Sequence, residues 1–154
     1  MNIFLDTNAV AKLYHREAGT DNLMSLIKLH KRDLVITLSD ITRIELHSAF
    51  FKQVRMKQLK PEIAAQVLSA FERDLGMFNV VEIEEEVKDF AAILLRRVAS
   101  KKSLRTLDAI QLSTALVSEQ ILPVDYFVTS DKKLIKVAKD YLPIFDPEQS
   151  TRGV

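Results

Sequence analysis

The segment from Ile3 to Asn8 constrains the fold of this chain more than any other. Three apolar residues run directly into Asp6, Thr7 and Asn8. A short continuous apolar run is typical of a strand that is buried on both faces of a parallel sheet. The polar residues then lie at the carboxyl end of the strand, where open α/β sheets bind their ligands. A buried carboxylate is costly unless it has a partner, so Asp6 is the first candidate for a functional residue.

The rest of the chain alternates between strand-like and helix-like segments. Further strands are predicted at 34–38, 79–83, 126–129 and, at a sheet edge, 144–145. Helices are predicted at 9–15, 20–30, 40–59, 61–76, 84–102, 106–120 and from 131 onward. Strands that alternate with helices imply a parallel sheet with right-handed crossovers. We therefore predict a three-layer α/β/α, Rossmann-like domain over residues 1–146, with a parallel sheet of four or five strands and a flexible tail at 147–154.

Composition excludes several classes of function. The formal net charge is +1, so binding of nucleic acid would need a local basic patch or bound metal ions. The chain has no cysteine, which excludes disulfides, thiolate zinc sites and cysteine nucleophiles. Its three glycines are too few for a P-loop or a dinucleotide fingerprint. Because we find no signal-like segment and no apolar run of about 18 residues, we expect a cytoplasmic protein with no membrane partner.

Three further carboxylates lie next to predicted apolar surfaces. Glu45 has apolar residues four positions before and after it, so the helical period puts it on or beside the face that packs on the core. Asp108 has the same spacing to its own apolar neighbours. Asp131 follows a buried strand just as Asp6 does. Two acids at strand ends and two on helices over those ends predict one shared cleft.

Four acids in one cleft repel each other, and a divalent cation is the usual remedy. Each acid taken alone has a simpler explanation, a helix cap or a lone salt bridge, and Asp131 in particular fits an N-cap. The histidines give no competing catalytic arrangement, and we expect His15 and His47 to be partly exposed helix residues. The alternative of four unrelated structural acids stays open at this point.

Four segments together resemble a known family, the PIN-domain nucleases, and within it the VapC-type toxins of toxin–antitoxin pairs. These segments are Phe4–Asn8, Ile44–Leu46, Leu104–Leu112 and Phe127–Asp131, and the similarity extends from Asn2 to about Phe145. The resemblance implies an endoribonuclease that uses one or two Mg²⁺ or Mn²⁺ ions. It also implies a homodimer that is inhibited by a small antitoxin protein.

On this resemblance, Asp6, Glu45, Asp108 and Asp131 correspond to the acidic, metal-binding and catalytic quartet. Asp6 and Asp108 are expected to contact metal directly. Glu45 is expected either to bind metal or to orient the attacking water, and Asp131 to act directly or through water. The supporting polar groups of the family fall at Thr7, Asn8 and Thr129. Basic residues that we expect to bind the RNA backbone around the cleft are Lys12, Arg16, Arg43, Lys101, Lys102 and Arg105.

The helical region 40–78 carries more large apolar residues than one core face needs. On the helix 40–59 we expect Ile41, Ile44, Ala49 and Phe51 to pack inward. The excess, which indicates either a dimer interface or a thick core, consists of Phe50, Phe51, Met56, Leu59, Met77 and Phe78.

Three other functions are compatible with parts of this pattern. A receiver-type phospho-acceptor domain needs paired acids after its first strand, where this chain has only Asp6, and Ser39-Asp40 is a poor substitute. A non-catalytic binding module would keep the fold without the chemistry. A PIN nuclease of RNA processing would act outside any toxin system. The sequence does not identify the RNA target.

Overall fold

The computed structural model describes residues 1–149, and its centre is a five-stranded sheet. The strands are β1 (Asn2–Leu5), β2 (Val35–Ser39), β3 (Asn79–Val81), β4 (Tyr126–Val128) and β5 (Ile144–Phe145). Their order is β3-β2-β1-β4-β5, and every neighbouring pair is parallel. The predicted parallel sheet is confirmed.

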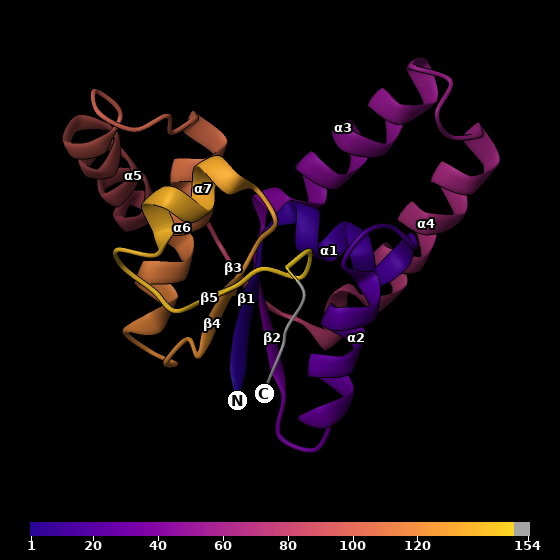
Figure 1. The fold of residues 1–154 in the computed structure, drawn as a ribbon, viewed down its shortest axis with the longest axis horizontal. Helices are drawn as coiled ribbons and strands as arrows, with labels where there is room; N and C mark the ends of the chain where they lie inside the picture. The colour runs from indigo at the N-terminus through magenta and orange to yellow at the C-terminus, as the bar shows by residue number, and fades with distance from the viewer. Residues whose placement is uncertain (150–154) are drawn as a thin grey trace.

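Helices cover both faces of the sheet (Figure 1). One face carries α1 (Thr7–Tyr14), α2 (Thr20–Leu29), α3 (Ile41–Arg55) and α4 (Pro61–Asp74), with a short 3₁₀ turn, η1 (Leu75–Met77), after α4. The other face carries α5 (Glu85–Val98), α6 (Thr106–Glu119) and α7 (Lys132–Ala138). This is the predicted three-layer α/β/α arrangement. No helix within residues 1–149 is both long and apolar enough to cross a membrane.

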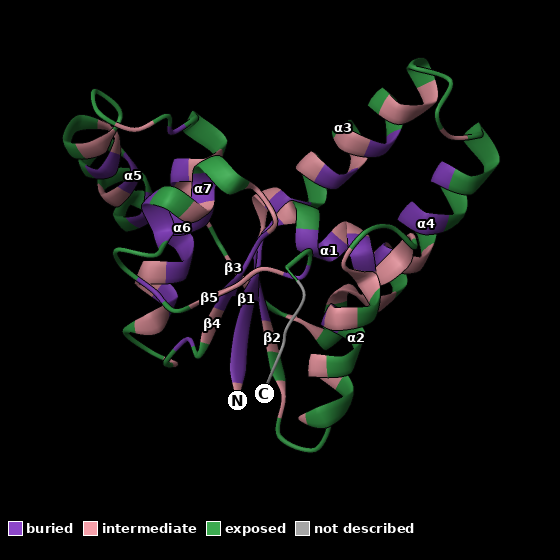
Figure 2. Cartoon of the chain, in the orientation of Figure 1, coloured by how far each residue is buried: buried purple, intermediate pink, exposed green. Residues whose placement is uncertain are grey.

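Strand β1 is buried on both faces, as its apolar run predicts (Figure 2). Ile3 and Leu5 belong to the core under α1–α4, whereas Phe4 belongs to the core under α5–α7. Phe4 stacks on Phe127 of β4 with ring centroids 5.5 Å apart. The alternation of side chains along the strand therefore divides its apolar residues between two separate cores.

The strand order places a topological switch point between β1 and β4. From β1 the chain proceeds outward to β2 and β3, and then returns to add β4 and β5 on the opposite side of β1. The helices that follow β1 and β4 thus leave on opposite faces, which opens a crevice at the carboxyl ends of these two strands. The Asp6 amide extends the pairing by donating to the Val128 carbonyl at 3.1 Å. Asp6 and the end of β4 are therefore adjacent.

The predicted inward face of α3 is wrong in part. Ile44 and Phe51 are 67% and 52% exposed, whereas the buried residues of this helix are Thr42, Leu46 and Phe50. The buried residues recur every four positions and form one stripe. Figure 1 shows the reason, because α3 and α4 form a hairpin that extends beyond the sheet and leaves its outer surface without a neighbour.

The excess apolar residues of this region divide in the same way. Phe50 is buried, while Leu59 and Phe78 are partly buried. Those that are exposed are Phe51, Met56 and Met77. A thick core therefore accounts for half of the set and leaves the other half on the surface.

The first residues of the predicted flexible tail are packed. Pro147 is buried, and the Asn22 side chain donates to its carbonyl at 2.8 Å. Pro147 also lies so close to Gly19 (φ 84°) that a Cβ there would approach it to 2.8 Å. Residues 147–149 thus have partners on α2 and in the loop before it, and the flexibility of the tail stays a prediction. Residues 150–154 lie outside the described part of the chain.

Candidate active site

An open cavity of ≈ 520 Å³ lies at the carboxyl ends of β1 and β4. All four predicted acids line it, although they are far apart in sequence. Its lining includes Asp6, Thr7, Asn8, Glu45, Lys52, Arg105, Asp108, Gln111 and Asp131. The sheet supplies the acids at strand ends, while α3 and α6 supply the other two from opposite faces.

Asp6 is the most buried of the four acids, with 4% of its surface exposed. Its Oδ1 caps α1 by accepting from the Ala9 amide at 2.8 Å, and its Oδ2 accepts from the Thr129 hydroxyl at 2.5 Å. Burial raises the pKa of Asp6 to about 7, although these two hydrogen bonds oppose the shift. The charges of Glu45 and Asp131 raise this pKa further. Near neutral pH the strand end thus holds a carboxyl group that is only partly ionised, and a bound cation would favour its charged form.

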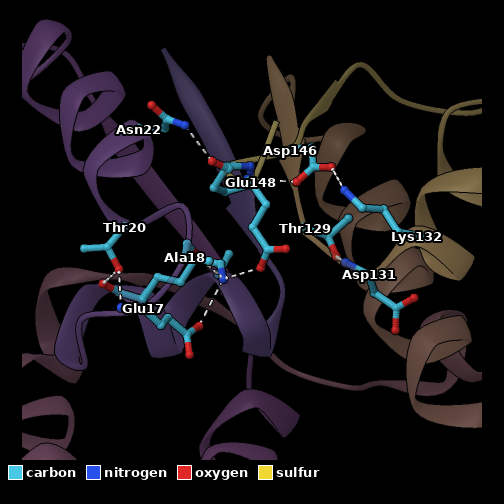
Figure 3. Close-up of polar contacts among 12 residues, drawn as sticks. Glu17, Ala18, Thr20, Asn22, Thr129, Asp131, Lys132, Asp146 and Glu148 are labelled. Carbon is cyan, nitrogen blue, oxygen red and sulfur yellow. Dashed lines mark hydrogen bonds and ion pairs between the residues drawn. The ribbon is translucent and has the colours of Figure 1, made fainter. Parts of the chain in front are cut away.

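Thr129 joins the two acids at the strand ends. Its hydroxyl donates to Asp6 and accepts from the backbone amide of Asp131 at 3.1 Å, a contact that is drawn in Figure 3. Asp131 Oδ1 accepts from the amides of Lys133 and Leu134 at 2.8 and 3.1 Å. Asp131 is therefore the N-cap of α7, as one of the open interpretations held, and it also lines the cavity.

Glu45 is held from two other helices. The Thr7 hydroxyl donates to Glu45 Oε2 at 2.7 Å, and the Gln111 side-chain amide donates to the same oxygen at 2.6 Å. Gln111 is not among the site residues predicted from the sequence. A signal was present, because Gln111 lies three residues after Asp108 and therefore on the same side of α6.

Arg105 connects the remaining acids across the mouth of the cavity. Its Nε lies 3.0 Å from Asp108 Oδ2, and its Nη2 lies 2.8 Å from Asp131 Oδ2. The side chain is 68% exposed, whereas those of Asp108 and Asp131 are 18% and 17% exposed. The contacts with Asp108, and then with Asp131, raise the pKa of Arg105. A single exposed cation thus neutralises part of the charge of this acidic site.

The site fits a hard divalent cation by its donor chemistry. Within residues 1–149, no three acidic or histidine side chains are already gathered tightly enough to hold a metal ion. The cavity nevertheless offers only oxygen ligands, which Mg²⁺ and Mn²⁺ prefer. A rotation of the exposed Arg105 side chain would free one oxygen each on Asp108 and Asp131. The buried Asp6 carboxylate adds a negative charge that its neighbours only partly satisfy.

The prediction that Lys12 belongs to the RNA-binding rim is wrong. Its side chain is only 3% exposed, and Nζ lies 3.0 Å from Glu17, 2.9 Å from Glu148 and 2.9 Å from the Ala18 carbonyl. Figure 3 labels these three partners, and the dashed lines from them meet at one side-chain nitrogen. Burial opposes the charge of Lys12, but the hydrogen bonds that its ammonium donates to Glu148 and Glu17 outweigh burial and raise the pKa of Lys12. Lys12 therefore stabilises the fold and is not available to RNA.

The other basic residues of the rim occupy different places. Arg105 lines the cavity, and so does Lys52, which was not predicted from the sequence. Lys101 is exposed, but it is not part of the lining. Ion pairs outside the lining join Arg16 to Asp21, Arg43 to Glu72 and Lys102 to Asp140. RNA binding by Arg16, Arg43, Lys101 and Lys102 stays a prediction.

Comparison with known proteins agrees with this architecture. The family model described as the PIN domain matches residues 3–140. Ribonuclease VapC35 of Mycobacterium tuberculosis is 30% identical over 137 residues, which cover 89% of this chain and 90% of that protein.

Two solved structures share the fold. VapBC2 from Rickettsia felis, bound to a DNA fragment from its promoter, has a TM-score of 0.70 at 17% identity, with 95% of this chain and 98% of that chain covered. VapC20 of Mycobacterium tuberculosis, a toxin that cleaves the sarcin–ricin loop, has a TM-score of 0.57 at 16% identity, with coverages of 87% and 93%. The matched family model and the relative at 30% identity lead to one conclusion: this chain belongs to the PIN-domain family.

Proposed function

We propose that this protein is a metal-dependent endoribonuclease that hydrolyses RNA phosphodiester bonds as the toxin of a toxin–antitoxin pair. The observation that carries the proposal is the convergence of four acids on one cavity at the switch point of the sheet. The names of the relatives support the reaction, since one is a ribonuclease and another is a toxin that cleaves the sarcin–ricin loop. Action on cellular RNA would place the protein in the cytoplasm.

We assign the metal-binding role to Asp6 and Asp108, with Glu45 and Asp131 as further ligands or as groups that act through water. When bound, one or two Mg²⁺ or Mn²⁺ ions would supply Lewis-acid stabilisation of the phosphate and an activated water. The protein groups fix the direction of the carboxylates. Thr129 holds Asp6, while the amides of α7 hold Asp131. Ligand atoms fixed in this way need little rearrangement when substrate arrives.

Positive charge at the mouth of the cavity would bind the RNA backbone. Arg105 is exposed and carries a planar guanidinium, which suits two-point contact with a phosphate. Lys52 on α3 and Asn8 on α1 also line the cavity, Lys52 with a second positive charge and Asn8 with an uncharged polar side chain. Transfer of Arg105 from the two aspartates to a phosphate would free carboxylate oxygens for metal. Binding of RNA would then increase the affinity for metal, and binding of metal would increase the affinity for RNA.

A small antitoxin and a second copy of this chain are the proposed protein partners. The relatives in solved structures include the VapBC2 complex, which supports an antitoxin. Ile44 and Phe51 lie seven residues apart on α3, and therefore on one face, and both are exposed. Exposed apolar side chains on one face are typical of an interface. We assign this face to the homodimer, and a monomeric mass in light scattering across a wide concentration range would contradict that assignment.

The experiment that tests the enzymatic proposal uses purified protein and a mixture of structured and single-stranded RNAs. We expect cleavage in Mg²⁺ or Mn²⁺, none in EDTA, and none with Asp108→Asn under either condition. Asp89→Asn, which changes an exposed aspartate on α5, is the matched control and should cleave normally. Cleavage that continues in EDTA, or that survives Asp108→Asn, would contradict the proposal.

A further inference from the structure

Gln111 lies at a junction of three helices beside the cavity. It is 3% exposed, and its Nε2 lies 2.6 Å from Glu45 Oε2. The same nitrogen lies 3.1 Å from the hydroxyls of Thr7 and Thr42. Gln111 belongs to α6 on one face of the sheet, whereas its partners belong to α1 and α3 on the other. One side chain therefore ties the two walls of the cavity together.

The direction of the Gln111 amide is fixed by its contact with Glu45. The reverse orientation would place two acceptor oxygens 2.6 Å apart, whereas the observed one gives the carboxylate an N–H donor. Among the described residues, both donors to this carboxylate, Gln111 and Thr7, use Oε2. The arrangement leaves Oε1 for another partner and fixes the rotation of the carboxylate about its own axis.

This arrangement carries a cost to the fold. Gln111 Oε1 is buried, and it has no hydrogen-bond partner within residues 1–149. A buried acceptor without a hydrogen-bond partner lowers the free energy of unfolding. An apolar side chain of similar length would fill the same space without that cost. Stability alone therefore does not explain a glutamine here, whereas the short contact with Glu45 does.

We infer that Gln111 is a positioning residue, which acts through Glu45 by holding Oε2 so that Oε1 faces the metal and its water. The inference rests on the proposed function in that it takes Glu45 to serve a divalent cation. Hydrogen-bond partners that orient a ligand typically contribute 10- to 100-fold to metal affinity or activity. Gln111 should contribute within this range, and its contribution should vanish when Glu45 is absent.

Titration with Mn²⁺ alone, followed by calorimetry, tests this coupling. The variants are Gln111→Met, Glu45→Gln and the double variant. Thr114→Val is the matched control, because Thr114 is buried one turn further along α6 and hydrogen-bonds to Ser39 away from Glu45. We expect Gln111→Met to weaken Mn²⁺ binding about 10- to 100-fold, and Thr114→Val to leave it unchanged. In the Glu45→Gln background, Gln111→Met should have no further effect.

Two results would overturn the inference. One is an unchanged Mn²⁺ affinity in Gln111→Met, and the other is an equal loss with and without Glu45, which would indicate a general loss of structure. Thermal unfolding of each variant checks the fold, and Gln111→Leu provides a second apolar replacement if Gln111→Met does not fold. RNA cleavage by wild type separates the two proposals. If Gln111 and Glu45 are coupled in Mn²⁺ binding but wild type does not cleave RNA, only the nuclease proposal is refuted. If wild type cleaves RNA but the two residues are not coupled, only the role of Gln111 is refuted.

Discussion

The two acids at strand ends and the two acids on helices are held in different ways. Asp6 and Asp131 cap helices through backbone amides and share Thr129, so the sheet and the helix starts fix them. Glu45 and Asp108 depend on contacts with side chains, which for Asp108 means the exposed Arg105. The difference indicates that the strand ends provide a rigid half of the site. On the helices, Thr7 and Gln111 hold Glu45 in place, whereas Asp108 forms an adjustable contact with Arg105, which can move as metal and RNA bind.

The largest effect on RNA cleavage should come from a substitution of Asp6, in the rigid half of the site. Asp6→Asn keeps the shape and the cap but removes a charged ligand, so we expect RNA cleavage to fall by more than about 10³-fold. In metal-free buffer at about pH 7.5, the same variant should unfold at an equal or higher temperature, because a buried charge is gone. Cleavage assays and thermal unfolding measure the two effects. A marked loss of metal-free stability would mean that Asp6 is needed for structure.

The dependence of stability on pH should distinguish Asp6 from the more exposed acids. Its pKa is about 7 in the folded chain, whereas an aspartate that is fully exposed to water has a pKa of 3.8. The folded state therefore binds more protons between these values, and stability is highest below the lower value and falls as pH rises through the higher one. The loss should reach about 4 kcal/mol near pH 7 and then level off.

Urea unfolding in EDTA between pH 4 and pH 8 measures this loss. Asp6→Asn is the control, because it keeps every other titrating group, and the difference between the two proteins isolates the contribution of Asp6. Saturating Mg²⁺ should reverse the loss by binding the folded, ionised site. If the difference in unfolding free energy between wild type and Asp6→Asn does not change with pH, the raised pKa of Asp6 is contradicted.

A smaller effect on stability should distinguish the buried Lys12 from Lys52, which lines the cavity. Lys12→Met leaves Glu17 and Glu148 without their shared cation, and we expect a loss of about 1–3 kcal/mol, since both carboxylates can reach water. Lys52→Met should leave stability nearly unchanged and weaken RNA binding. Unfolding curves and filter binding to RNA measure the pair. Weaker RNA binding by a fully folded Lys12→Met would restore Lys12 to the rim.

The smallest effect should come from the adjustable contact between Asp108 and Arg105. Arg105→Gln removes the two ion pairs that this exposed arginine forms with Asp108 and Asp131, so the free energy of unfolding should change by less than about 1 kcal/mol. Without a competing guanidinium, Mn²⁺ should bind roughly two- to five-fold more tightly in the absence of RNA. RNA should bind more weakly, because a phosphate contact is lost. Weaker Mn²⁺ binding would show instead that Arg105 holds the acids in place for metal.

The sequence predicts the sheet well because a strand that is buried on both faces leaves a continuous apolar run. The edge strand at 144–145 is found where it was expected, and Asp6 follows β1 as the motif requires. The face of α3 is harder to predict, because apolar residues lie on several sides of this helix. Ile44 and Phe51 could be placed only with knowledge that the α3–α4 hairpin extends past the sheet.

Contacts between distant segments account for the remaining errors. Lys12 is a plausible rim residue until Glu148, 136 positions later, is known to meet it. Gln111 lies within the Leu104–Leu112 segment and three residues after Asp108, but it has no charge, and its role depends on Glu45 of another helix. The packing of Pro147 could not be predicted for the same reason, since its partner Asn22 lies on α2. Each of these residues obtains its role from a pairing that local sequence does not encode.

One set of Mn²⁺ titrations tests most directly the claim that four acids form a single metal site. Calorimetry would compare wild type with Asp6→Asn, Glu45→Gln, Asp108→Asn and Asp131→Asn, and with Asp89→Asn as an exposed acid outside the cavity. We predict saturable binding by wild type and by Asp89→Asn, and weaker binding by all four cavity variants. Wild-type binding that survives unchanged in Asp6→Asn and Asp108→Asn would show that these acids do not share a metal, and would contradict the single site.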